Sequence, residues 1–237
     1  MFEDINIKEN NSNIHLIGIG GVSMRAIAKI LVHKGFNVSG SDMKSSKSTD
    51  LLESKGIKVY IGHKESNVKG SDLIIYTAAI DLYNNPEIIG AKKYDIPIIS
   101  RADILGMIMK SYKESIAIAG THGKTTSTSM LSLIMNETEY DPTIMIGGNL
   151  KEIGGNLKIG SDKVLISEAC EYKESFIKFY PTVGVILNID EDHLDYFENL
   201  DHIVSAFIKF AKLIPKNGYL VANNDDYNAK KVFSHVN

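Results

Sequence analysis

Only one cysteine, Cys170, occurs among the 237 residues, so the chain cannot form a disulfide within itself. An excess of positive charge is also missing, since a net charge of −3 and a pI near 6.2 give no basic field to attract nucleic acid or an anionic membrane. No apolar run approaches the length of a membrane span, and the first residues, MFEDINIKENN, are acidic and polar, unlike a signal peptide. We therefore expect a cytoplasmic protein with no nucleic-acid partner and no membrane insertion.

Proline is scarce as well, with 5 residues, whereas 19 glycines indicate many turns without low complexity. Apolar residues make up 43% and charged residues 23%, as in an ordinary folded chain. The length is sufficient for one large or two medium domains, each with its own core.

Strand and helix patterns alternate through the first hundred residues. Apolar strands are expected within 13–21, 37–42, 57–62, 72–80 and 96–100, and helices within 22–35, 49–56 and 87–95. Strands that are apolar throughout and alternate with helices favour a parallel sheet covered on both faces. This half of the chain predicts a Rossmann-like domain over residues 1–111.

A second α/β sheet is predicted to begin near residue 115, after an amphipathic helix over 101–114. Its expected strands lie within 115–120, 142–148, 162–168, 181–189 and 218–223, and its expected helices within 124–137 and 200–214. We assign residues 112–237 to this domain, which we expect to be an incomplete ATPase of the P-loop type.

The first glycine loop, GIGGVS, follows the first predicted strand and opens a helix. Gly18, Gly20 and Gly21 resemble the dinucleotide fingerprint G-x-G-x-x-G, although Ser23 replaces the third glycine. Such glycines permit close approach of a diphosphate to the helix N-terminus. Asp42, about twenty residues further on, is placed like the acid that binds a ribose hydroxyl. A simple strand-to-helix turn is the alternative explanation, and the loop indicates a diphosphate nucleotide more firmly than it indicates NAD.

The second glycine loop, GTHGKTT, resembles the P-loop G-x-x-x-x-G-K-[ST], but Ile118 stands where the first glycine should be. The loop still joins a strand to a helix, so its backbone N–H groups can converge on phosphate oxygens. Lys124 is placed to reach the β- and γ-phosphates, and the Thr125 hydroxyl to hold Mg²⁺. We expect the ATP contacts to come from this loop: Gly120, Thr121, His122, Gly123, Lys124, Thr125 and Thr126. For His122 a side chain that points away from the phosphates is equally open.

Polar residues follow two later strands and are expected to share the crevice of this loop. Glu168 ends one apolar strand, and the segment after another strand carries Asn188, Asp192, His193 and Asp195. A carboxylate and an imidazole beside the γ-phosphate suit a second Mg²⁺ ion.

Two further residues, Cys170 and Glu171, follow Glu168 closely. We interpret both as mainly structural, since nothing near them in sequence resembles a base that would activate the thiol.

Six segments, taken in order, closely resemble the Mur ligases of peptidoglycan synthesis: IHLIGIGGVSM, SGSD, YTAAI, AGTHGKTT, ISEACEYKESF and LNIDEDHLDYF. The resemblance runs from about residue 12 to the last residue. The histidine of GTHGKTT is similar to that of the alanine-adding branch and of its relative that recycles murein tripeptide, and GIGGVSM favours the alanine-adding branch. Ser23 departs from the more usual glycine of the family.

The resemblance implies site residues in both domains. In the first domain, UDP-sugar contacts are implied for Gly18, Gly20, Gly21, Asp42, Ala78, Ala79 and Ile80. His63 is a further candidate for a UDP-sugar contact, and a surface turn is the alternative. The segment Gly147–Asn149 is a candidate for contact with the same substrate, although glycines between elements need no functional explanation. In the second domain, the implied catalytic residues are Lys124, Glu168 and His193, and the implied metal ligands are Thr125, Glu168 and His193.

The implied reaction is ATP-dependent ligation of L-alanine to UDP-N-acetylmuramate through an acyl phosphate, with ATP and Mg²⁺ as cofactors. The resemblance also implies a third domain, for the amino acid, that this chain lacks, so we expect a fragment that is inactive by itself. The alternatives are a murein tripeptide recycling ligase, a non-catalytic module that binds UDP-sugar and ATP, and an NAD-dependent dehydrogenase. The dehydrogenase is disfavoured because hydride transfer has no use for the Lys124 loop.

Overall fold

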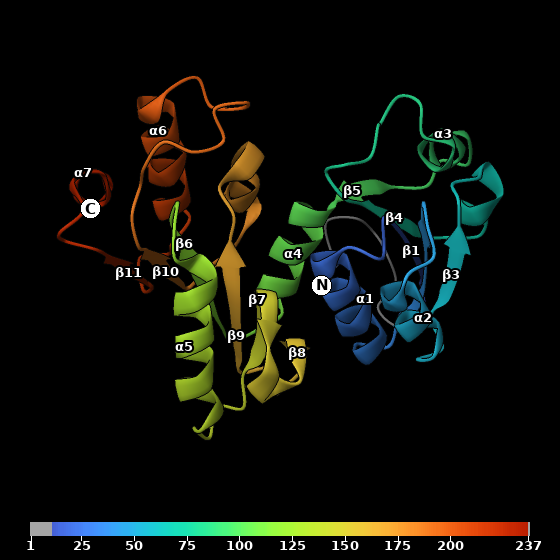
Figure 1. Cartoon of the computed structure of the whole chain (residues 1–237), viewed down its shortest axis with the longest axis horizontal. Helices are drawn as coiled ribbons and strands as arrows, with labels where there is room; N and C mark the ends of the chain where they lie inside the picture. Colours follow the sequence, from blue (N-terminus) through green and yellow to red (C-terminus); the bar gives the residue numbers. More distant parts are fainter. Residues whose placement is uncertain (1–10, 237) are drawn as a thin grey trace. The chain divides into compact units, whose positions relative to one another are not determined.

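The computed structural model describes residues 11–236, and the chain divides into two compact units between Leu105 and Gly106 (Figure 1). The division falls inside helix α4 (Arg101–Lys110). Each unit contains one β-sheet with helices packed against it, so the predicted α/β class is confirmed.

The N-terminal unit contains a five-stranded, fully parallel sheet in the order β3-β2-β1-β4-β5. Its strands are β1 (Asn13–Ile17), β2 (Asn37–Asp42), β3 (Lys58–Ile61), β4 (Leu73–Tyr76) and β5 (Ile98–Ser100). The helices that connect them are α1 (Val22–His33), α2 (Lys47–Glu53) and α3 (Pro86–Lys93), with a short 3₁₀ helix, η2 (Glu65–Val68). The strand order reverses between β1 and β4, and this is where ligands bind in sheets of this kind.

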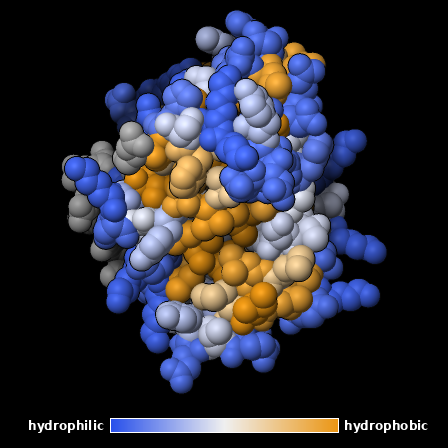
Figure 2. Space-filling model, turned by 90° about the vertical axis from the view of Figure 1, so that its left-hand side faces the viewer, coloured by the Kyte–Doolittle hydropathy of each residue, from blue (hydrophilic) through white to orange (hydrophobic). Residues whose placement is uncertain are grey.

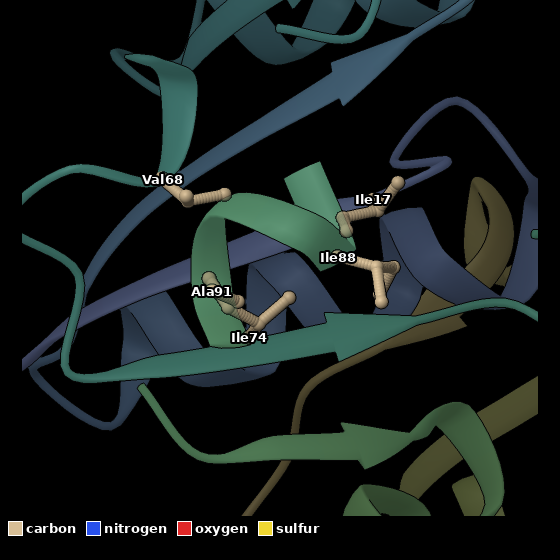
Figure 3. Close-up of a cluster of buried hydrophobic side chains, with 5 residues drawn as sticks. All are labelled: Ile17, Val68, Ile74, Ile88 and Ala91. Carbon is tan, nitrogen blue, oxygen red and sulfur yellow. The ribbon is translucent and has the colours of Figure 1, made fainter. Parts of the chain in front are cut away.

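Helix α3 covers one face of this sheet through a compact apolar cluster. Ile88 and Ala91 of α3 pack with Ile17 of β1 and Ile74 of β4 (Figure 3). Asn85 caps the helix by accepting hydrogen bonds from two backbone N–H groups of its first turn, and Pro86 at the first helical position fixes where the helix starts. The first turn of α3 is therefore firmly placed on the sheet.

The second unit contains a six-stranded mixed sheet in the order β11-β10-β6-β9-β7-β8. Its strands are β6 (Glu114–Ala119), β7 (Thr143–Leu150), β8 (Gly155–Lys158), β9 (Val164–Ala169), β10 (Val183–Ile186) and β11 (Tyr219–Ala222). Its helices are α5 (Lys124–Asn136), α6 (Leu200–Ala211) and α7 (Tyr227–Phe233), with 3₁₀ segments η3 (Lys151–Ile153) and η4 (Tyr172–Lys178). Because β9 and β10 flank β6, the ends of these two strands lie on either side of the loop that follows β6.

Among the α-helices and strands of residues 11–236, two were not predicted, β8 and α7, and the three 3₁₀ segments were not predicted either. Strand β8 pairs antiparallel with β7, and its segment Gly155–Lys158 holds one apolar side chain, Leu157, so neither alternation nor an apolar run indicated a strand. The strand expected over 72–80 ends at Tyr76, because the chain turns at Thr77, whose carbonyl accepts a hydrogen bond from Ile80 N. Within residues 11–236, no helix combines the length and the apolar character that a bilayer span requires.

Candidate nucleotide-binding sites

The loop after β6 has a glycine with positive φ at each end. Gly120 has φ +146° and Gly123 has φ +81°, values that favour glycine. A Cβ atom on Gly120 would lie 3.0 Å from Cβ of Leu187. Gly123 forms the N-cap of α5, so the unpaired N–H groups of that helix begin directly at Lys124.

Asn188, two residues after the end of the neighbouring strand β10, holds the loop by hydrogen bonds. Its side-chain oxygen accepts a hydrogen bond from His122 N at 2.8 Å, and its amide nitrogen donates to His122 O at 3.0 Å. Thr121 N donates to Asn188 O at 3.1 Å. The side chain of His122 is exposed while its backbone is fixed, so the structure leaves both interpretations of this residue open.

The ammonium group of Lys124 folds back over its own loop. Nζ donates to Gly120 O at 2.5 Å, to Thr121 O at 3.0 Å and to Oε1 of Glu171 at 3.0 Å. The second oxygen of Glu171 also lies 3.0 Å from Nζ, but it is buried and accepts no hydrogen bond of good geometry from the described residues. The buried carboxylate of Glu171 therefore holds the Lys124 ammonium group against the loop.

Glu168 lies beside the first turn of α5, as the sequence suggested. Thr125 Oγ1 donates to Glu168 Oε2 at 3.1 Å, and Gly147 N donates to Glu168 Oε1 at 2.7 Å. A Cβ on Gly147 would lie 3.0 Å from Glu168 Oε2, so the glycine at this point of β7 gives the carboxylate room. A hydroxyl and a carboxylate side by side are oxygen ligands of the kind that Mg²⁺ prefers.

His193 belongs to a second group of potential metal ligands, with Glu171 and Asp192. One ligand atom from each of the three residues lies within 4.8 Å of the others. His193 has φ +53°, and its N–H donates to Asp192 Oδ1 at 2.7 Å, which fixes the turn after β10. The donor set of two carboxylates and one imidazole fits a divalent cation.

Tyr172 supports the same turn. Its ring lies 4.6 Å from the His193 ring, and its hydroxyl donates to Asp195 Oδ2 at 2.8 Å, which raises the pKa of Tyr172. The adjacent residues Lys173 and Glu174 both have positive φ, so this part of η4 is irregular.

In the N-terminal unit, the glycine loop follows β1 at the point where the strand order reverses. Gly18 has φ +81°, and a Cβ there would lie 2.6 Å from Thr77 Cγ2, so the loop and the turn after β4 are close together. Ala78 and Ala79 of that turn are exposed, while Ile80 packs against the α3 cluster. The predicted UDP-sugar residues of both turns thus lie at one end of the sheet.

Asp42 and Ser23 each make a hydrogen bond that bears on the first glycine loop or on the helix after it. Asp42 Oδ2 accepts a hydrogen bond from Gly20 N at 2.9 Å, and a Cβ on Gly20 would lie 2.7 Å from that oxygen. Ser23 Oγ accepts a hydrogen bond from Arg101 Nη1 at 3.2 Å. Asp42 therefore shapes the loop directly, and Ser23 links α1 to α4.

Two family models cover most of the chain. Residues 13–113 match the catalytic domain of the Mur ligase family, and residues 118–237 match the Mur ligase middle domain. The chain belongs to the Mur ligase family. The two glycine loops thus lie in two different matched domains of a Mur ligase.

Curated relatives of this Mur ligase chain include two UDP-N-acetylmuramate–L-alanine ligases. The one from Clostridium botulinum (strain Okra / Type B1) is 57% identical over 98% of this chain, and the one from Clostridium kluyveri (strain ATCC 8527) is 58% identical over 96%. In both cases the match covers 50% of the relative. The chain therefore spans about half the length of these relatives.

Solved structures agree with this family. UDP-N-acetylmuramate-alanine ligase from Thermotoga maritima is 30% identical with a TM-score of 0.82, over 93% of this chain and 51% of that one. A ligase named for UDP-N-acetylmuramate and L-alanyl-γ-D-glutamyl-meso-diaminopimelate, from Neisseria meningitides, is 26% identical with a TM-score of 0.86, over 94% of this chain and 75% of that one.

Among the residues expected to form the Mur ligase ATP site, the structure brings Thr125 and Glu168 together, and it groups His193 with other residues. Glu171, expected to be structural, is 1% exposed and contacts both Lys124 and the His193 group. One sequence signal could have identified it: a second acid directly after the strand that ends near Glu168. His63 contacts Ser41 and Glu87, which lie outside the predicted site.

Proposed function

We propose that this chain is the nucleotide-binding part of an enzyme that ligates L-alanine to UDP-N-acetylmuramate with ATP. The observation that carries the proposal is the 57% identity to a curated UDP-N-acetylmuramate–L-alanine ligase along nearly the whole chain. The arrangement of Lys124, Thr125 and Glu168 around one loop supports it, because ATP-dependent ligation needs side chains that bind the phosphates and a metal ion.

The two units have separate tasks in this proposal. The N-terminal unit binds the UDP part of UDP-N-acetylmuramate at the glycine loop, with the turn 77–80 beside it. The second unit binds ATP through the loop 120–126. Thr125 with Glu168, and Glu171 with Asp192 and His193, would each hold Mg²⁺, which supplies positive charge to the phosphate oxygens. Use of ATP and a nucleotide sugar fits a cytoplasmic location, which we include in the proposal.

The reaction proceeds in two steps that each balance. A carboxylate oxygen of UDP-N-acetylmuramate attacks the γ-phosphorus of ATP, the bond to the bridging oxygen breaks, and ADP leaves. The amine of L-alanine then attacks the carbonyl carbon of the acyl phosphate, inorganic phosphate leaves, and the amine loses a proton. Lys124 exchanges its loop carbonyls and Glu171 for the transferring phosphoryl group, where a fixed positive charge stabilises the transition state.

Calorimetry on the 237-residue chain tests the binding roles. We expect separate binding of UDP-N-acetylmuramate and of ATP with Mg²⁺, and no binding of NAD. Replacing Gly20 by leucine should abolish UDP-sugar binding and leave ATP binding intact, because a side chain there collides with Asp42. Tight NAD binding without UDP-sugar binding would refute the proposal.

A recycling ligase is the second candidate, favoured by the TM-score of 0.86 to the Neisseria ligase. An assay of the full-length protein separates the two candidate activities. It supplies ATP and UDP-N-acetylmuramate together with either L-alanine or the tripeptide L-alanyl-γ-D-glutamyl-meso-diaminopimelate. We expect product with L-alanine, and product with the tripeptide alone would select the recycling activity.

A further inference from the structure

A buried polar cluster lies on the α3 face of the N-terminal sheet. We call it the Glu87 cluster; it consists of Glu87, His15, Ser41, His63 and Asn67. Glu87, His15 and Ser41 are 0% exposed. The members come from β1, β2, η2, α3 and the turn after β3, so five separate segments meet at one carboxylate.

Both oxygens of Glu87 are saturated. Oε2 accepts from Ser41 Oγ at 2.6 Å and contacts His63 Nδ1 at 2.7 Å. Oε1 accepts from Asn67 Nδ2 at 2.7 Å and contacts His15 Nε2 at 3.3 Å. An ionised carboxylate offers about four acceptor positions, so all of them are used when both histidine nitrogens carry a proton.

The surroundings keep Glu87 ionised despite its burial. Burial alone would raise the pKa of the carboxyl, but hydrogen bonds from His15, Ser41 and Asn67 together outweigh it and hold the pKa below its ordinary value. Glu87 also lies in the first turn of α3, where the helix dipole favours a negative charge. Replacing a whole buried ionic group by apolar residues is often neutral in stability, whereas removing one partner of such a group is destabilising.

The cluster connects to the glycine loop through the backbone of Ser41 and Asp42. Ser41 O accepts hydrogen bonds from Gly18 N at 2.8 Å and from Ile19 N at 3.0 Å. Asp42 then holds Gly20 N with its side chain, so three successive loop amides are bound by two successive residues. The side chain of Ser41, on the other side of the same residue, is held by Glu87.

A second connection runs through the turn after β3. Gly62 N donates to Asp42 O at 2.8 Å, and Asn67 Nδ2 donates to Gly62 O at 3.1 Å as well as to Glu87. Displacement of Glu87 would therefore remove one hydrogen bond from the Ser41 side chain and one from Asn67, the residue that holds the Gly62 carbonyl beside Asp42.

We infer that Glu87 is a positioning residue of the UDP-sugar site: without touching the ligand, it fixes Ser41 and Asp42 and thereby the diphosphate loop Gly18–Gly20. The inference rests on the proposed function for the identity of the ligand. It assigns a role to a residue outside both glycine loops, 69 positions from Gly18 in the chain.

The test is Glu87→Gln in the 237-residue chain, with Glu65→Gln as the matched control. Glu65 lies in the same unit and also accepts two hydrogen bonds, from Lys93 and Tyr94, but among residues 11–236 these side-chain bonds reach neither the loop nor the Glu87 cluster. We expect UDP-N-acetylmuramate to bind about tenfold to a hundredfold more weakly to Glu87→Gln, the effect of removing one partner from a buried network. ATP affinity should stay unchanged in the same samples, as should both affinities in Glu65→Gln.

Amide hydrogen exchange without ligand distinguishes positioning from a purely structural role. Glu87→Gln should speed exchange at Gly18 and Ile19 beyond any change at Ile74, whose N–H donates to Pro97 O in the sheet. Equal acceleration at all three amides, or unchanged affinity in a folded variant, would overturn the inference. If the wild-type chain does not bind UDP-N-acetylmuramate, the proposed function fails, but the exchange at Gly18 and Ile19 still decides whether Glu87 positions the loop.

Ser41→Ala serves as the second variant in case Glu87→Gln does not fold. It removes one hydrogen bond to Glu87 and keeps the Ser41 carbonyl. We expect a smaller loss of affinity, about threefold to tenfold, with the same selective exchange. Wild-type affinity and exchange in Ser41→Ala would overturn the inference.

Discussion

Lys124 is the residue on which the ATP proposal depends most directly. In a full-length enzyme, we expect turnover to fall most in Lys124→Ala, less in Glu168→Ala and least in His193→Ala. In the proposed mechanism, Lys124 places its charge on the transferring phosphoryl group, and loss of such a contact costs on the order of a hundred- to thousandfold in rate. Excess Mg²⁺ should partly restore the Glu168 and His193 variants by mass action, but not the Lys124 variant.

A titration of turnover with Mg²⁺, with melting temperatures measured on the same samples, checks this order. Rescue of Lys124→Ala by metal, or no rescue of the other two, would contradict the assigned roles. A fall in melting temperature in all three variants would indicate instead that the residues act through stability.

The lowered pKa of Glu87 predicts how the stability of the N-terminal unit changes in acid. A carboxyl whose pKa is lowered by folding contributes stability above its unfolded pKa of about 4.3. That contribution is lost as the pH falls through the lower, folded pKa. The free energy of unfolding of the wild-type unit should therefore decrease as the pH drops below about 5.

The variant Glu87→Gln isolates this effect. It should be less stable at pH 7, by about 1–3 kcal/mol for a buried network with a lost partner, and its stability should depend less on pH between 5 and 3. Urea denaturation across this range, monitored by a probe in the N-terminal unit, gives the slope. An identical slope in wild type and variant would show that Glu87 is not the group that titrates.

Helix α4 is an element whose packing depends on one glycine. A Cβ on Gly106 would lie 2.1 Å from Lys178 O and 3.2 Å from the Tyr180 ring, so the helix backbone rests directly on the end of η4. Nearby, Lys110 Nζ lies 3.9 Å from the centroid of the Tyr180 ring. The close approach therefore excludes any side chain at residue 106.

Gly106→Ala should destabilise the chain by about 1–3 kcal/mol through overpacking, although alanine favours a helix over glycine by about 1 kcal/mol. Gly21→Ala is the control, because the added Cβ would lie 3.5 Å from Gly18 O, an ordinary contact. Urea denaturation of both variants measures the difference. Stabilisation by Gly106→Ala would mean that α4 and η4 are not in tight contact in solution.

At the scale of the whole molecule, strand β11 forms an exposed edge of the second sheet. Tyr219 and Val221 are 71% and 54% exposed, and in the parallel register they lie opposite Val183 and Val185, which are half-buried. The same side of the molecule has an extended apolar area on its surface (Figure 2). Exposed apolar edges of this kind are sites of self-association.

Val221→Lys should reduce self-association of the 237-residue chain, because a charge at an edge strand opposes pairing with a second edge. Val32→Lys, on α1 and 42% exposed, is the control and should have little effect. Sedimentation velocity over a range of concentrations compares the three proteins. Equal association in all three would show that β11 is not the surface involved.

The sequence by itself determined the local features: strands alternating with helices, the two glycine loops, and Lys124 and Thr125 at the start of a helix. These follow from short-range rules, since apolar periodicity fixes the element type and glycine fixes where a turn with positive φ can form. Glu168 and Asn188 lie next to the second loop in the structure, as the carboxyl ends of neighbouring parallel strands lie at one edge of a sheet.

Only the tertiary structure decided which distant groups share a buried site. Glu87 meets His15, 72 residues away, and Glu171 meets Lys124, 47 residues away. A buried carboxylate must find its hydrogen-bond donors wherever the packed elements bring them, and no periodicity along the chain encodes that meeting. Strand β8 also depends on tertiary structure. Its four residues form a strand because they hydrogen-bond to β7, not because of their own sequence pattern.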